Sequence, residues 1–233
     1  MGTEASRGNA ARWQARAAAW ELLAMTFRYP DAVLADAVAT GEWAEAACEV
    51  ADVLGLALPE SWDAGLGAAG AAGAGAEGAQ VVLGELRPEA TRLFVGAPGP
   101  AVSPYEGVWR AADDGVQPLL FVNPHSMEVE RFMRSCGLGH PAGTNEPLDH
   151  AAAECELLEH LALRAAGAPA PEGAPAAEAL PGGSPQAAYG EFLRDHVCAW
   201  MPRFARALAA ESRHPLYRAA AHLLEALLAG EGA

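Results

Sequence analysis

The stretch GLGHPAGTNEPLDHAAAECELLEHL, residues 137–161, contains the change from a Gly/Pro-rich loop to a helix of the core. Pro147 has no N–H group and biases Glu146 toward extended backbone, so a helix is predicted to begin just after Pro147. An apolar stripe at helical spacing follows, formed by Leu157, Leu158 and Leu161. The segment therefore predicts a loop that leads directly into a buried helix.

Two ionisable residues, Asp149 and His150, fall in the first turn of this predicted helix. Asp149 or Asn145 is predicted to supply the N-cap. A neighbouring Asp-His pair is either a cap with a hydrogen-bonded histidine or part of a binding site. On its own, the pair favours the structural interpretation, and the rest of the chain is needed to decide between the two.

The composition is that of one globular domain, which we expect over residues 1–233. Hydrophobic residues make up 52% of the chain and charged residues 19%. No convincing alternation of apolar and polar residues occurs, whereas three- and four-residue apolar spacing recurs throughout. The predicted fold class is therefore all-α, a single helical-bundle domain.

The net charge of the chain is −15, and all 15 of its basic residues are arginines. Nucleic acid is excluded as a partner, because phosphate binding needs clustered positive charge. A positively charged peptide would instead be attracted. A phosphate-binding loop with its lysine is impossible in a chain without lysine.

The four cysteines are far apart and form no Cys-x-x-Cys motif, so ordinary thiols are expected at Cys48, Cys136, Cys155 and Cys198. No apolar run of about 18 residues exists, and stable membrane insertion is not expected. The polar N-terminus lacks the apolar core of a signal peptide. We therefore expect a cytoplasmic protein.

Helices are predicted over 10–29, 31–39, 42–56, from Pro88 to Gly96, from Asn123 to Cys136, up to Ala166, from Ser184 past Pro202, and over 215–228. The Gly/Ala stretch 64–79 is compatible with either weak helix or loop. Residues 167–184 are predicted to be a flexible surface linker. Packing roles are expected for Trp13, Trp20, Trp43, Trp62, Trp200 and Phe204.

Four sequence blocks occur in a characteristic order. They are Leu93-Phe94, then Ser103-Pro104-Tyr105-Glu106-Gly107-Val108-Trp109, then Glu146-Pro147-Leu148-Asp149-His150, and last Phe192-x-x-Asp195-His196-x-x-x-Trp200-x-Pro202-x-Phe204. This arrangement, from about Trp13 to Leu228, resembles the TorD/DmsD/NarJ-type family of chaperones for molybdenum-cofactor oxidoreductases. Two positions depart from the family pattern: Ala90 stands where an aromatic is usual, and Gly107 where serine is usual.

The resemblance implies a function and a lobe organisation. Such chaperones bind the twin-arginine signal peptide, or the apo form, of a molybdopterin oxidoreductase of the DMSO, TMAO or nitrate reductase kind and hold back its export until the cofactor is inserted. They have two lobes, here expected at about 10–139 and 151–229, joined by a hinge at about 140–150. The resemblance implies that the chaperone itself is not an enzyme and holds no cofactor. The long linker also permits a domain-swapped dimer as well as a monomer.

The family's peptide-binding residues are carried over by motif. The aromatics and leucines would contact the apolar part of the signal peptide, while Glu106, Glu146 and Asp149 would accept hydrogen bonds from its arginines. Asp195 and His196 are expected to be structural. The complete expected site consists of Leu93, Phe94, Pro104, Tyr105, Glu106, Trp109, Gly137, Leu138, Glu146, Pro147, Asp149 and His150.

Two other interpretations remain open at this point. Ligands for a metal-dependent helical enzyme could come from His150, Glu154, Glu156, Glu159 and His160, but the Glu-x-x-His spacing of di-iron bundles occurs only at Glu211-x-x-His214. A generic helical adaptor that binds a folded partner is the second alternative. Binding of the isolated leader peptide distinguishes the adaptor from the chaperone.

Overall fold

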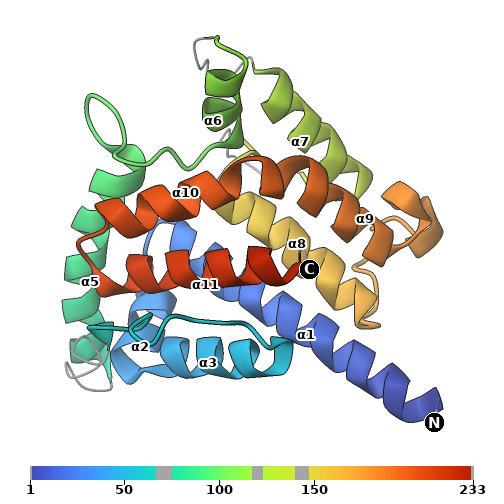
Figure 1. Ribbon diagram of the computed structural model, residues 1–233, viewed down its shortest axis with the longest axis horizontal. Helices are drawn as coiled ribbons and strands as arrows, with labels where there is room; N and C mark the ends of the chain where they lie inside the picture. The colour runs from blue at the N-terminus through green and yellow to red at the C-terminus, as the bar shows by residue number, and fades with distance from the viewer. Residues whose placement is uncertain (1, 67–74, 117–122, 140–146, 232–233) are drawn as a thin grey trace. The chain divides into compact units, whose positions relative to one another are not determined.

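A computed structural model describes residues 2–66, 75–116, 123–139 and 147–231, and it confirms the all-α class (Figure 1). Within these residues the only extended pairing is an isolated antiparallel bridge between Tyr105 and His150. None of the described helices is both long enough and apolar enough to cross a membrane.

The helices follow one another with short connections. The first part of the chain contains α1 (Gly2–Phe27), α2 (Ala32–Thr40), α3 (Glu42–Leu54), α5 (Ala76–Ala90) and the π-helical turn η1 (Thr91–Val95). The second part contains α6 (Glu106–Asp113), α7 (Pro124–Ser135), α8 (Ala151–Ala165), α9 (Pro185–Phe192), the π-helical turn η4 (Leu193–Val197), α10 (Cys198–Glu211) and α11 (Pro215–Glu231).

Most predicted helix ends are confirmed because their capping residues act locally. The Asp31 side chain accepts from the N–H groups of Val33 and Leu34 and begins α2. Gly41 separates α2 from α3 with a φ of +88°, a conformation that glycine adopts without strain. Asn123 and Ser184 likewise cap α7 and α9 through their side chains.

The helix start predicted at Pro88 is wrong. Pro88 lies inside α5, which begins at Ala76 and runs on into η1. A proline in a helix removes the N–H that would bond to the carbonyl four residues earlier, here that of Gly84. Because Pro88 and Gly84 are both exposed, water can hydrate that carbonyl, and the helix continues.

The chain forms two compact units, each made of two separate segments. The first unit comprises 1–21 and 105–201, and the second comprises 22–104 and 202–233. The expected lobes with a hinge at 140–150 stay a prediction, and residues 140–146 of that hinge lie outside the described residues.

An aromatic cluster forms the centre of the second unit. The Phe94 ring lies 6.3 Å from that of Phe204 and 5.6 Å from that of Tyr217, and Phe27 contacts Phe204 edge to face at 5.2 Å. In the same unit α2 packs against α3 and α5, and α11 against α3. The core position of Phe94 follows from this cluster.

Indole hydrogen bonds tie the predicted core tryptophans into the two units. In the first unit, Trp20 Nε1 donates to Tyr189 Oη at 2.8 Å, and in the second, Trp43 Nε1 donates to Thr26 Oγ1 at 3.0 Å. Both indoles are fully buried, as expected, and the N–H of each has an acceptor. Trp62 is also buried, and half-buried Trp13 contacts Tyr189 edge to face.

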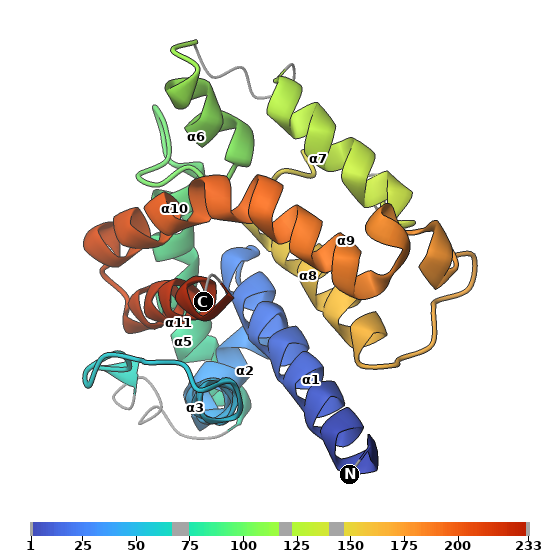
Figure 2. The same cartoon turned by 45° about the vertical axis from the view of Figure 1, so that its right-hand side comes forward.

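The first unit is built around α8 and α9, which lie side by side in both views (Figures 1 and 2). The apolar stripe predicted for α8 is confirmed, because Leu157, Leu158 and Leu161 are fully buried.

The segment 167–184 forms two short 3-10 turns, Ala177–Ala179 and Pro181–Gly183, and buries Leu180. Of the Gly/Ala stretch 64–79, residues 67–74 lie outside the described residues, and Ala76 begins α5.

Replacing Phe94 by alanine is expected to lower the free energy of unfolding by about 3–5 kcal/mol, because the change empties the centre of the aromatic cluster. The neighbouring Val95, which is 62% exposed, provides the control. Val95→Ala is expected to change the free energy by less than about 0.5 kcal/mol. Urea unfolding followed by circular dichroism measures both, and equal effects would contradict the core role of Phe94.

Candidate functional site

The loop before α6 is held directly against the loop before α8. Tyr105 and His150 form the antiparallel bridge, and the Glu106 N–H donates to the Asp149 carbonyl at 2.9 Å. Their side chains also meet, since the rings of Tyr105 and His150 lie 5.2 Å apart at 79°. Both residues are half-buried, so part of this ring pair is accessible at the surface of the first unit.

A buried carboxylate fixes the first turn of α6. Asp149 Oδ2 accepts from the Gly107 N–H at 2.9 Å and from Ser126 Oγ at 2.6 Å. Asn123 Nδ2 donates to the Gly107 carbonyl at 2.6 Å, so both polar backbone groups of Gly107 are held by side chains. Burial raises the pKa of Asp149, although its hydrogen bonds to Ser126 and Gly107 oppose that shift.

The same arrangement explains why position 107 carries glycine. A Cβ atom there would lie 2.5 Å from Ser126 Oγ and 2.9 Å from Asp149 Oδ2. Real Cβ atoms do not approach neighbours so closely, and both neighbours are engaged in hydrogen bonds. A larger residue at 107 would therefore push this pair of loops apart.

Two further carboxyl groups, those of Glu106 and Glu154, are fully buried beside Asp149. Arg110 Nη1 donates to Glu106 Oε1 at 2.7 Å, and His196 Nδ1 lies 3.2 Å from Glu106 Oε2. Trp200 Nε1 donates to Glu154 Oε2 at 3.0 Å. Burial, together with the charge of Glu106, raises the pKa of Glu154 well above its ordinary value.

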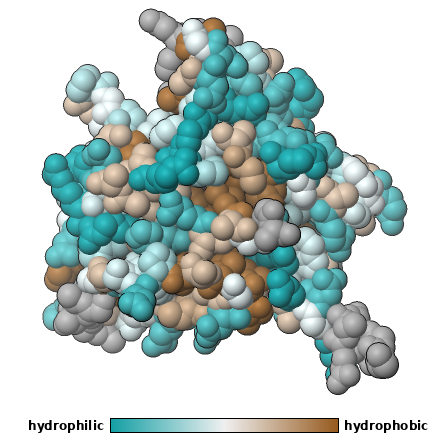
Figure 3. All heavy atoms as spheres, in the orientation of Figure 1, coloured by the Kyte–Doolittle hydropathy of each residue, from teal (hydrophilic) through white to brown (hydrophobic). Residues whose placement is uncertain are grey.

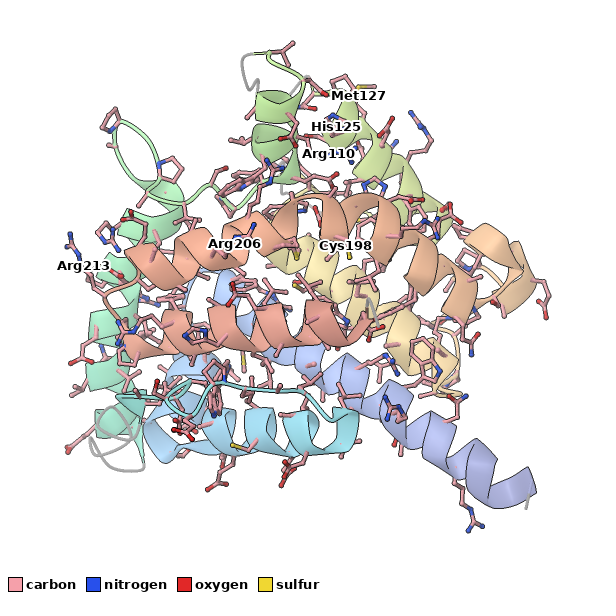
Figure 4. All side chains as sticks on the ribbon, in the orientation of Figure 1. Arg110, His125, Met127, Cys198, Arg206 and Arg213 are labelled. Atoms are coloured by element: carbon pink, nitrogen blue, oxygen red, sulfur yellow. The ribbon has the colours of Figure 1, made fainter. Side chains whose placement is uncertain are left out.

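Arg110 joins this group to η4. It projects from α6 (labelled in Figure 4) and its Nη1 also reaches the Asp195 carbonyl at 3.2 Å. His125, at the start of α7, contacts Asp114 through Nε2 at 2.8 Å and so ties the start of α7 to the residue that ends α6. Figure 3 shows mainly hydrophilic residues over α7, although Met127 of that helix is exposed. The loop pair is thus surrounded by polar contacts on α6, α7 and η4.

The predicted cap of α8 is corrected by the structure. The capping residue is His150, whose Nδ1 accepts from the Ala152 N–H at 3.1 Å, and not Asp149. The Asp149 side chain instead accepts hydrogen bonds from Gly107 and Ser126 through its Oδ2. Asn145, the other expected cap, lies outside the described residues.

The structure separates the predicted site residues into groups. Tyr105, Glu106, Asp149 and His150 lie together in the first unit, with half-buried Trp109 on the next turn of α6 and Pro147 in the loop before α8. Gly137 and Leu138 lie at the end of α7, where Gly137 approaches Pro175. Leu93, Phe94 and Pro104 belong to the second unit and are buried there. Glu146 lies outside the described residues.

Several residues of the site were not predicted as such: Arg110, Asn123, Ser126, Glu154 and His196. Glu154 did carry a signal, because it lies four residues before Leu158 and therefore on the buried stripe of α8. A glutamate on a core stripe requires a partner. For Ser126 the local sequence holds no such signal, because its partner Asp149 lies 23 residues away, whereas the spacing of Glu106 and Arg110, four residues apart, is that of an ion pair on one helix.

The residues that the alternative enzyme interpretation would need as metal ligands do not assemble in the described part of the chain. His150 caps α8, Glu154 bonds Trp200, and His160 has a pKa lowered by burial and by Arg164. Within those residues, no three His, Cys, Asp or Glu side chains are placed to hold a metal ion.

Comparison with known proteins shows that this protein belongs to the class of helical chaperones of redox-enzyme maturation. The chain belongs to the nitrate reductase delta subunit family, whose model matches residues 42–206, and this confirms the family resemblance. A solved structure of a proposed redox enzyme maturation protein from Archaeoglobus fulgidus is 18% identical, with a TM-score of 0.46, and the match covers 90% of this chain and 91% of that one. Among curated proteins, none matches.

Gly107→Ala is expected to lower the free energy of unfolding by about 1–3 kcal/mol, because the added methyl group displaces Ser126 or Asp149. Gly84→Ala is the matched control, since it makes the same change on an exposed helix face with no atom within 4 Å. This control is expected to stabilise the protein by about 0.5–1 kcal/mol. Thermal or urea unfolding measures both, and a neutral Gly107→Ala would show that the two loops are not tightly held.

Proposed function

We propose that this protein is a cytoplasmic chaperone that binds the twin-arginine signal peptide of a molybdopterin oxidoreductase subunit and keeps the apo-subunit from premature export. The family supports the general role in redox-enzyme maturation. The observation that carries the finer proposal is the ring pair Tyr105–His150, half-buried on a loop that buried hydrogen bonds hold in place.

The partly exposed aromatic groups of the first unit suit the apolar part of a leader peptide. Tyr105 and His150 are in contact, and half-buried Trp109 follows Tyr105 by four residues, one turn along α6. Tyrosine and tryptophan dominate binding energies at protein interfaces because they offer large, rigid contact areas. We therefore assign direct peptide contact to Tyr105, Trp109 and His150.

The role in peptide binding that we assign to the buried acids Glu106 and Asp149 differs from the role expected from the sequence. Glu106 and Asp149 are 0% and 1% exposed. Arg110 and His196 contact the two oxygens of Glu106, and the Gly107 N–H and Ser126 donate to Asp149 Oδ2, whereas the buried Asp149 Oδ1 has no partner among the described residues. Contact with arginines of a peptide would require both to be uncovered at a cost in desolvation and lost hydrogen bonds. We therefore assign them to positioning the loop, while the net charge of −15 attracts the arginines from a distance.

Tyr105→Ala is expected to weaken binding of a leader peptide about tenfold, because it removes one face of the ring pair. His150→Asn is designed to keep the α8 cap, since asparagine is a good capping residue, while removing the imidazole. Tyr29→Ala, at a tyrosine that is 59% exposed in the second unit, is the control and should bind like wild type. Isothermal titration calorimetry with a synthetic leader measures all three.

Wild-type affinity in Tyr105→Ala and His150→Asn, with both variants folded, would place the leader elsewhere on the protein. If the wild-type protein does not bind the leader but binds the leader-deleted apo-subunit, the result would instead support the interpretation as a generic adaptor.

The arginine pair of the leader is expected to affect mainly the association rate. A leader with both arginines replaced by alanine should associate more slowly with the acidic protein, and added salt should slow the natural leader toward the same rate. Stopped-flow fluorescence at low and high salt measures this. Association rates that do not depend on salt would contradict long-range attraction.

A further inference from the structure

The segment 171–176 belongs to the connection from α8 to α9 (Figure 2) and is held against the first unit by an arginine. Arg164 lies in the last turn of α8, and its Nη2 donates to the Pro175 carbonyl at 2.8 Å. The Pro175 ring also covers the end of α7, because a Cβ atom on Gly137 would lie 2.5 Å from Pro175 Cδ. Residues 171–173 are exposed, so one hydrogen bond and one proline ring hold a segment that otherwise faces solvent.

The guanidinium group of Arg164 is buried without a counter-ion. Arg164 is 8% exposed, its Nη1 has no hydrogen-bond partner among the described residues, and no described carboxylate forms an ion pair with it. The C-terminal dipole of α8 offsets about half of one elementary charge at most. Burial of a cation is costly unless an anion pairs with it. A negatively charged acceptor is therefore expected to bind Arg164 more strongly than the neutral Pro175 carbonyl does.

His160 adds a second polar atom to the same face of α8. It precedes Arg164 by four residues, and its Nε2 is buried and has no partner within the described part of the chain. Burial and the charge of Arg164 lower the pKa of His160, which is therefore neutral at neutral pH. The two side chains together carry one positive charge, which matches a monoanion, whereas a dianion would leave one negative charge unpaired.

A carboxylate is the monoanion that fits a guanidinium best. Its two oxygens accept from both arms of the planar fork, and such charge-assisted hydrogen bonds are about twice as strong as neutral ones. The Pro175 carbonyl, in contrast, accepts from one arm only. A carboxylate that takes both arms displaces this carbonyl, frees the segment 171–176 and uncovers Gly137 and the half-buried Leu138 at the end of α7.

We propose that Arg164 is a binding site for a carboxylate group that replaces the Pro175 carbonyl, and that the segment 171–176 is a strap that closes this site when no carboxylate is bound. The carboxylate is carried either by a small organic acid or by an acidic side chain of a polypeptide. The site does not depend on binding of the leader peptide.

The test titrates the isotopically labelled protein with three probes at constant ionic strength, maintained with sodium chloride. The probes are sodium acetate, the peptide acetyl-Ala-Glu-Ala-amide, and the neutral peptide acetyl-Ala-Gln-Ala-amide as the matched control. Backbone amide chemical shifts of residues 137, 138, 172–174 and 176 are followed by NMR spectroscopy. The proteins are wild type, Arg164→Gln, Pro175→Gly and the control Arg134→Gln, at an arginine of α7 whose side chain is 67% exposed.

We expect saturable shifts with acetate and with the glutamate peptide, and none with the glutamine peptide. Arg164→Gln should weaken the binding of both carboxylates about tenfold, and Arg134→Gln should bind them like wild type. Pro175→Gly should bind them about threefold more tightly, because a glycine makes the strap harder to order and so raises the open fraction. Tighter binding of the glutamate peptide than of acetate would identify a polypeptide as the carrier, and the reverse order a small acid.

A wild-type protein with no saturable shift at these residues would overturn the proposal, as would a folded Arg164→Gln with wild-type affinity or equal binding of the two peptides. If Arg164→Gln does not fold, the strap variant still decides. Equal carboxylate affinities of Pro175→Gly and wild type would show that the segment does not close the site.

Discussion

The hydrogen bond from the Gly107 N–H to the buried Asp149 carboxylate is the interaction on which the site depends. It joins the first turn of α6 to the loop before α8, 42 residues further along the chain. A buried carboxylate is costly unless hydrogen bonds satisfy it, so Ser126 and Gly107 must both remain in place. Asn123 adds the second restraint on Gly107 and also caps α7. Three segments are therefore positioned by one buried acid, and the half-buried ring pair of Tyr105 and His150 is positioned with them.

In this arrangement two adjacent residues, Asp149 and His150, have different roles. Asp149 faces inward and supports the loop, while His150 caps α8 and presents its ring to Tyr105. In the same way, Glu106 faces inward and supports the loop, while Tyr105 presents its ring to His150. Residues next to each other in an extended segment point in opposite directions, so alternation of a supporting residue and a surface residue follows from the backbone conformation. A loop restrained in this manner loses little conformational entropy on binding a peptide, which favours affinity.

Local sequence signals predicted most of the helices, although not α6, and they failed where distant contacts decide. That the two loops belong to one site was expected from the family resemblance. Asp31, Asn123 and Ser184 act on their own neighbours, so their helix starts were predictable. Pro88 was misinterpreted because its usual role at a helix start does not hold where water can satisfy the freed carbonyl. The contacts of Ser126 and His196 depend on partners 23 and 90 residues away, Asp149 and Glu106. No periodicity along the chain contains that information.

The π-helical turn η4 shows why the fourth sequence block has its spacing. A π-turn adds a residue to a helical turn and rotates the following side chains relative to a regular α-helix. Here η4 contains His196, which contacts Glu106, and α10 follows directly, with Trp200 in its first turn donating to Glu154. The two buried glutamates, Glu106 and Glu154, are thus contacted by two residues of one continuous helical segment that lie four positions apart. Asp195 contributes through its backbone carbonyl, which accepts from Arg110, while its side chain is exposed and pairs with Arg194. The Asp195-His196 pair of the sequence therefore contacts α6 through Arg110 and Glu106, and Glu106 directly follows Tyr105.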